Sequence, residues 1–140
     1  MEKDITATTG ELVETIARYF AAVPQVTTVY LFGSRASGRA RVGSDVDIAV
    51  LFVPGLPELE RFDAKLTFAV DLSRLTHLEF DVVDLNSAPP LLKYAVRQNN
   101  ILVVNKDDAY RVAFEVKSRR EYFDLKPRLD ARAKAILARY

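Results

Sequence analysis

The sequence predicts an α/β (α+β) fold with a small mixed sheet of about four strands. Helical patterns alternate with short runs rich in β-branched and aromatic residues, and Gly, Pro or Asn residues punctuate these segments. No internal repeat or low-complexity linker interrupts the 140 residues. We therefore expect a single domain over 1–140, with a core over 9–105, helices packed on one face of the sheet, and a long C-terminal helical extension over 106–140.

In the first half, Thr8 or Thr9 is a suitable N-cap for a helix that runs to about Ala22. The β-branched and aromatic run Val26–Phe32 predicts a buried strand. After a glycine-punctuated loop, the segment 45–53 predicts a second strand with clear alternation. Val46, Ile48, Val50 and Phe52 share one face, whereas Asp45, Asp47 and Ala49 share the other.

In the second half, a helix should run from Pro57 to about Leu75, with a core stripe formed by Leu59, Phe62, Leu66 and Val70. A third strand is expected over 78–85 and a helix after Ser87. A short strand over 101–104 follows, and then C-terminal helices that Pro127 separates.

The stretch from Gly33 to Asp47 combines two features that suggest phosphoryl or nucleotidyl transfer. Gly33 lets the backbone approach an anion closely, and the Ser34 hydroxyl and N–H groups at a helix start can donate to phosphate oxygens. Asp45 and Asp47 point to one side of a strand, where they supply hard oxygen ligands for Mg²⁺.

A third carboxylate is expected from the strand over 78–85. If Phe80 and Val82 face the core, Asp81 lies on the same side of the sheet as Asp47, whereas Asp84 is better explained as a structural cap. The single histidine, His77, precedes this strand and is interpreted as a surface or loop-anchoring residue.

Composition excludes several classes. The chain has no cysteine, which rules out disulfides and thiolate metal sites. We expect a cytoplasmic protein, since neither a secretory signal nor an apolar run long enough to span a membrane is visible. Residues 1–105 carry a net charge of −3 and residues 106–140 a net charge of +4, a split too mild to predict direct nucleic-acid binding.

The spacing of Gly33-Ser34, Asp45-Val46-Asp47 and Asp81 resembles the nucleotidyltransferase superfamily with the DNA polymerase β-like palm. Within it, the chain is most similar to minimal nucleotidyltransferases, especially the MntA-type antitoxins of HEPN–MNT toxin–antitoxin pairs. The Gly-Ser-Arg-Ala-Ser-Gly loop, the Ala88-Pro89-Pro90 segment and the Tyr122-Phe123-Asp124 segment support this narrower resemblance.

The resemblance implies transfer of AMP from ATP to a tyrosine of a HEPN ribonuclease toxin. Asp45, Asp47 and Asp81 would hold two Mg²⁺ ions, and Asp81 would serve as base or as metal ligand only. Gly33, Ser34, Arg35 and Ser44 would bind the nucleotide phosphates, with Arg39 and Arg41 as further candidates. Only about 35 residues follow the last strand, so a partner protein is expected to complete the acceptor side.

Two other functions remain open. An antitoxin could neutralise its toxin by binding alone, through its basic C-terminal segment. Alternatively, a small-molecule nucleotidyltransferase of the aminoglycoside-modifying type could borrow its acceptor pocket from a second copy in a homo-oligomer. The residues do not distinguish ATP from other nucleoside triphosphates.

Overall fold

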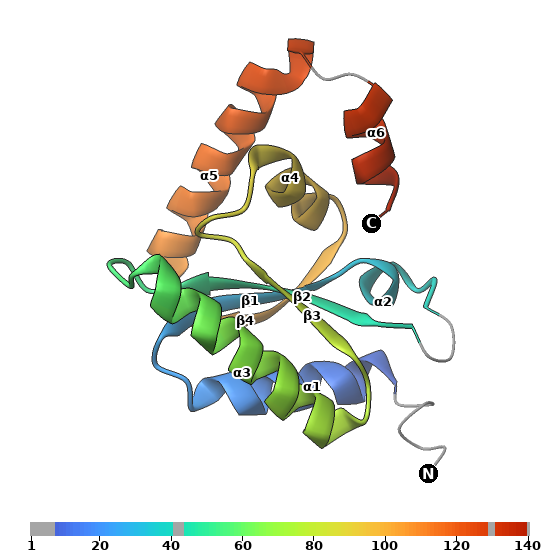
Figure 1. Cartoon of the computed structure of the whole chain (residues 1–140), viewed down its shortest axis with the longest axis vertical. Helices are drawn as coiled ribbons and strands as arrows, with labels where there is room; N and C mark the ends of the chain where they lie inside the picture. Colours follow the sequence, from blue (N-terminus) through green and yellow to red (C-terminus); the bar gives the residue numbers. More distant parts are fainter. Residues whose placement is uncertain (1–7, 41–43, 129–130, 140) are drawn as a thin grey trace.

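A computed structural model describes residues 8–40, 44–128 and 131–139. The molecule has three layers, with a central sheet, helices α1 (Thr9–Ala21) and α3 (Glu58–Thr76) on one face, and helices α4 (Pro90–Gln98) and α5 (Asp108–Leu125) on the other (Figure 1). The predicted α/β fold with a long C-terminal helix is confirmed. The expectation that helices pack on only one face is wrong, because α4 and α5 cover part of the second face.

The four strands are β1 (Val26–Phe32), β2 (Val46–Phe52), β3 (Phe80–Asp84) and β4 (Asn100–Asn105), and they lie in the order β3-β2-β1-β4. Strand β1 pairs antiparallel with both β2 and β4, whereas β2 and β3 are parallel. Parallel neighbours need a crossover connection, which α3 supplies. The sheet is therefore mixed, as the sequence predicts.

Alternation along β2 separates two apolar cores. Val46, Ile48, Val50 and Phe52 pack with residues of α1 and α3, including Ile16, Phe20, Phe68 and Leu72. Ala49 and Leu51 point the other way and pack with Val96 of α4 and with Tyr110 and Phe114 of α5. Asp47 has the parity of Ala49 and Leu51, so it belongs to the face that α4 and α5 share.

The prediction that Leu59, Phe62, Leu66 and Val70 form the buried face of α3 is wrong. These residues are exposed, with Leu59 at 72%, Phe62 at 49%, Leu66 at 51% and Val70 at 50% of their maximal accessibility. Helix α3 instead buries Phe68 and Leu72, and Phe68 lies within 5.0 to 6.1 Å, between ring centroids, of Tyr19, Phe20 and Phe52. This aromatic cluster selects the buried side of the helix.

Helix α1 begins as predicted, because the Thr8 hydroxyl accepts a bond from the Glu11 N–H and the Glu11 carboxylate accepts one from the Thr8 N–H. On the other face, Lys93 of α4 forms an ion pair of 2.9 Å with Glu121 of α5.

The C-terminal segment continues with a 3₁₀ turn, Lys126–Arg128, and helix α6 (Ala131–Ala138), which lies against α4 (Figure 1). None of the helices in the described residues has the length and apolar character that a membrane crossing requires.

Candidate active site

The site begins at the turn between β1 and the short helix α2 (Ser34–Ser37). Gly33 has a φ of 75°, a conformation that side chains disfavour, and its carbonyl accepts bonds from the Ala36 and Ser37 N–H groups. A Cβ at Gly33 would lie 2.4 Å from Asp47 Oδ2. Only glycine lets the turn lie directly against this carboxylate.

Three carboxylates meet at one end of the sheet. Asp47 pairs with Phe32 at the end of β1 and with Asp81 of β3, so the two aspartates are neighbours on adjacent parallel strands. Asp45 lies two residues before Asp47, just ahead of β2. The structure therefore brings Gly33, Asp45, Asp47 and Asp81 together, as the sequence predicts.

Asp47 is half-buried, and its environment is unfavourable for a negative charge. Burial, together with repulsion from Asp81 and Asp45, raises the pKa of the Asp47 carboxyl from 3.8 to about 6. A cation would relieve this repulsion.

A magnesium ion fits the chemistry of these residues. All the donors are carboxylate oxygens, and Mg²⁺ commonly takes one or two protein carboxylates and completes its shell with water and substrate phosphates. Among the described residues, no three carboxylate or imidazole groups are gathered tightly enough to hold an ion by themselves. The fit therefore needs phosphate oxygens as well as Asp45, Asp47 and Asp81.

Two arginines of the loop have hydrogen-bond partners within the loop itself, and their expected role as phosphate ligands stays a prediction. The Arg35 side chain is 8% exposed, and its Nη2 donates to the Ser44 carbonyl at 2.7 Å. The contact ties α2 to the residue before Asp45, so Arg35 braces the loop. Arg39 Nε donates to the Ser37 hydroxyl at 3.0 Å, and Arg41 lies outside the described residues.

Ser34 remains a suitable phosphate ligand by position. It is the first residue of α2, a helix of four residues in which the Ala36 and Ser37 N–H groups already donate to the Gly33 carbonyl. Its side-chain hydroxyl makes no hydrogen bond with the described residues, and Ser34 is half-buried beside Gly33. The roles of Ser34 and Ser44 in phosphate binding stay predictions.

Asp84 and His77 have the structural roles expected of them. The Asp84 carboxylate pairs with Arg61 at 2.9 Å and accepts bonds from the Asn86 N–H and the Ser87 hydroxyl. His77 is exposed and ends α3 with a φ of 60°, its N–H donating to the Ser73 carbonyl. Asp81 is thus the carboxylate of β3 that faces Asp47.

Sequence reasoning missed the brace between Arg35 and Ser44. The only signal was an arginine two residues after Gly33 in a loop that must return to Asp45, and this signal does not distinguish a brace from a phosphate ligand. The sequence also did not indicate that the apolar stripe of α3 is exposed. Apolar periodicity shows that a helix has an apolar face, but it does not show what covers that face.

Residues 14–109 match the family model described as polymerase beta, nucleotidyltransferase. Over 72 residues, the chain is 38% identical to the protein adenylyltransferase MntA of Shewanella oneidensis MR-1. This match spans 50% of the chain and 48% of that relative, or about half the length of each.

Solved structures resemble the chain over most of its length. A chain in the crystal structure of a toxin–antitoxin with AMP-PNP is 28% identical, with a TM-score of 0.70, and the alignment covers 90% of this chain and 95% of that one. A chain in the structure of a tri-AMPylated Shewanella oneidensis HEPN toxin in complex with MNT antitoxin is 25% identical, with a TM-score of 0.67, and covers 94% and 97% of the two chains.

Proposed function

Because the chain belongs to the polymerase β-like nucleotidyltransferase family, which its residues 14–109 match, we propose that it is a magnesium-dependent protein adenylyltransferase. Its acceptor is a tyrosine of a HEPN-type ribonuclease toxin, and the chain serves as the antitoxin. The observation that carries the proposal is the row of Gly33, Asp47 and Asp81, in which a phosphate turn lies against paired carboxylates. The likeness to MntA and to toxin–antitoxin structures supports the choice of acceptor.

In this reaction, the tyrosine oxygen attacks the α-phosphorus of ATP and forms a new P–O bond. The bond from the α-phosphorus to the bridging oxygen breaks, and pyrophosphate leaves with the bond electrons. Magnesium, when bound by Asp45 and Asp47, supplies positive charge to the phosphate oxygens. Asp81, an exposed carboxylate beside Asp47, would complete the set of carboxylates that hold the metal, and it accepts the tyrosine proton.

Each remaining part of the site has a defined task. Gly33 permits the turn to pack on Asp47, and Ser34 donates its hydroxyl to the terminal phosphates. Arg35 keeps the loop in place through the Ser44 carbonyl.

The test is transfer of label from α-labelled ATP to the product of the neighbouring gene, which the proposal expects to be the HEPN-type toxin, with Mg²⁺ present. We expect the toxin to carry AMP on tyrosine and to lose ribonuclease activity. Asp81→Asn should abolish labelling, whereas Asp63→Asn, an exposed carboxylate on α3, should not change it. Absence of labelling by any nucleoside triphosphate would contradict the proposal.

Neutralisation by binding alone is the second candidate, because α5 exposes Lys117, Arg119 and Arg120 on one stretch of helix. A double variant, Asp45→Ala with Asp47→Ala, separates the two. If it still forms the complex but no longer protects cells from the toxin, catalysis is required. If protection is complete, occlusion is sufficient.

A further inference from the structure

Helix α3 carries an apolar stripe that faces away from the sheet. Its four members, Leu59, Phe62, Leu66 and Val70, are spaced by three or four residues and are about half exposed or more. Together they expose on the order of 400 Å² of apolar surface, which is as large as the main patch of a typical monomeric protein. The largest apolar patch of a monomeric protein is often a functional surface.

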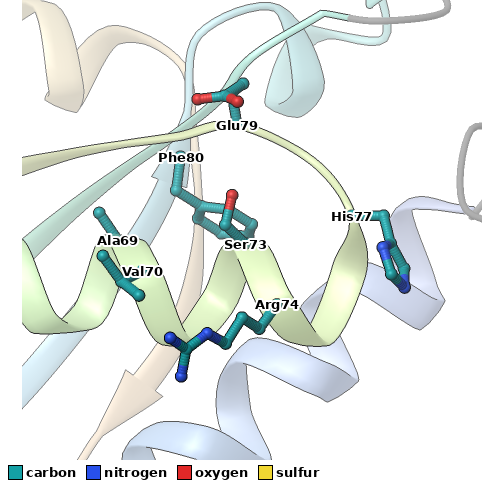
Figure 2. A pocket seen from close by; sticks show the side chains of 7 residues that line it. All are labelled: Ala69, Val70, Ser73, Arg74, His77, Glu79 and Phe80. Atoms are coloured by element: carbon teal, nitrogen blue, oxygen red, sulfur yellow. The ribbon is translucent and has the colours of Figure 1, made fainter.

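A hollow lies at the C-terminal end of the stripe. It has a volume of about 540 Å³ and lies between the last turns of α3 and the start of β3 (Figure 2). Seven residues line it: Ala69, Val70, Ser73, Arg74, His77, Glu79 and Phe80. The hollow is large enough for a leucine side chain, and Leu59, at the opposite end of the stripe, is 72% exposed.

The charges beside the stripe are separated along the helix. Glu58, Glu60 and Asp63 are exposed in its first two turns, whereas Arg74 is exposed near its end. The other charged groups of the helix have partners within the chain: Arg61 with Asp84, Asp71 with the Tyr19 hydroxyl, and Lys65 over the Phe62 ring. The first end therefore carries three exposed carboxylates, whereas Arg74 is the exposed cation of the second end, where Glu79 also lines the hollow.

We propose that the stripe binds a second copy of this chain, with the two α3 helices antiparallel about a two-fold axis near Leu66. In a two-fold dimer the same surface of both copies forms the interface, so that surface must be complementary to itself. The exposed face of α3 carries both members of each residue pair that the register below brings together. The register places Glu58 opposite Arg74, Leu59 opposite Ser73 at the hollow, and Phe62 opposite Val70. Each contact occurs twice, once on either side of the axis.

The carboxylates stay accessible in such a dimer. Asp47 projects from the face of the sheet that α4 and α5 share, whereas α3 covers the other face. The dimer therefore leaves the site open to a nucleotide and an acceptor. Its existence does not depend on the proposed adenylyl transfer.

Because the chain has no native cysteine, single cysteines report the geometry directly. Leu66→Cys should form a disulfide-linked dimer on mild oxidation, since the two side chains meet at the axis. Leu59→Cys alone should not, because fourteen helical residues place its two copies about 20 Å apart. The double variant Phe62→Cys with Val70→Cys should link, because these two exposed positions lie opposite each other in the proposed register. Val112→Cys, at a position 42% exposed on α5, is the matched control for random collision.

Sedimentation of the untagged protein gives an independent measure. We expect a weak dimer with a dissociation constant on the order of 10 µM, because two stripes of about 400 Å² make an interface at the low end of the size range. Leu66→Glu should make the protein monomeric, and Val112→Glu should not. Glu58→Arg or Arg74→Glu alone should weaken the dimer about tenfold, and the two together should restore it.

Several results would overturn the proposal. A monomer at 200 µM, roughly twenty times the expected dissociation constant, excludes the dimer. If Leu66→Cys and Val112→Cys form disulfide-linked dimers to the same extent, the cross-links arise from random collisions between molecules and not from an interface on α3. If the protein alone is monomeric but Leu66→Glu loses binding to the toxin, the occupant is that partner and not a second copy. Circular dichroism and a thermal melt verify that each variant is folded.

Discussion

Replacing Asp47 by asparagine should make the metal-free protein more stable at neutral pH. The substitution keeps the shape of the side chain and removes a charge that burial disfavours and that Asp81 and Asp45 repel. The pKa of this carboxyl rises from 3.8 to about 6. Two units correspond to about 3 kcal/mol of unfavourable free energy, and solvent screening at a half-buried side chain reduces this to about 1–2 kcal/mol.

The contribution of Asp47 ionisation to folding stability depends on pH. Below about pH 4, Asp47 is protonated in both the folded and the unfolded chain, so it contributes nothing to the difference in stability. Between pH 4 and 6, the unfolded chain loses the proton first, and ionisation increasingly disfavours the folded state. The full effect is present above pH 6.

Urea unfolding in EDTA at pH 7.5 and at pH 4 measures the effect, and a thermal melt at pH 7.5 should show a gain of about 3–6 °C for Asp47→Asn. The advantage should disappear at pH 4. Asp84→Asn, which weakens an ion pair, is the control and should destabilise. Adding Mg²⁺ should stabilise the wild type more than the variant. A variant that is less stable than the wild type at pH 7.5, or equally altered at both pH values, would refute the reasoning.

Three further substitutions test other parts of the structure. Gly33→Ala should lower nucleotidyl transfer about 100-fold or more in the labelling assay while circular dichroism stays unchanged, because the new Cβ displaces the Asp47 carboxylate, to which we assign magnesium binding. Asp84→Ala should cost about 3 kcal/mol in urea unfolding, since it leaves the Arg61 guanidinium, 14% exposed, without its partner; a loss under 1 kcal/mol would mean that the pair is unimportant. Phe68→Ala should cost about 3–4 kcal/mol, and Phe62→Ala less than about 0.5 kcal/mol in dilute protein, because only the first ring is buried; similar losses would contradict the assignment of the buried face.

The alternation of side chains along a strand explains why the sequence predicts the positions of Asp47 and Asp81 well. Successive side chains of a strand point to opposite faces, so the apolar set Val46, Ile48 and Val50 determines where Asp47 must lie. The same rule distinguishes Asp81 from Asp84. These inferences depend only on local geometry, which the structure preserves.

The helix α3 shows what local pattern cannot decide. Both Leu66 and Phe68 belong to apolar sets on this helix, and either set could have been buried. The choice depends on rings supplied by Tyr19, Phe20 and Phe52, which are remote in sequence. Similarly, the burial of Arg35 depends on where the following loop returns, and no short-range signal specifies that.

The two ends of α3 are both fastened to β3. Near its start, Arg61 pairs with Asp84 at the end of the strand, and near its finish, the Ser73 hydroxyl donates to the Leu78 carbonyl just before the strand begins. Asp81 lies in the chain between Leu78 and Asp84, and it is the ladder partner of Asp47 on β2. The position of α3 therefore helps to determine where the third carboxylate lies relative to the second.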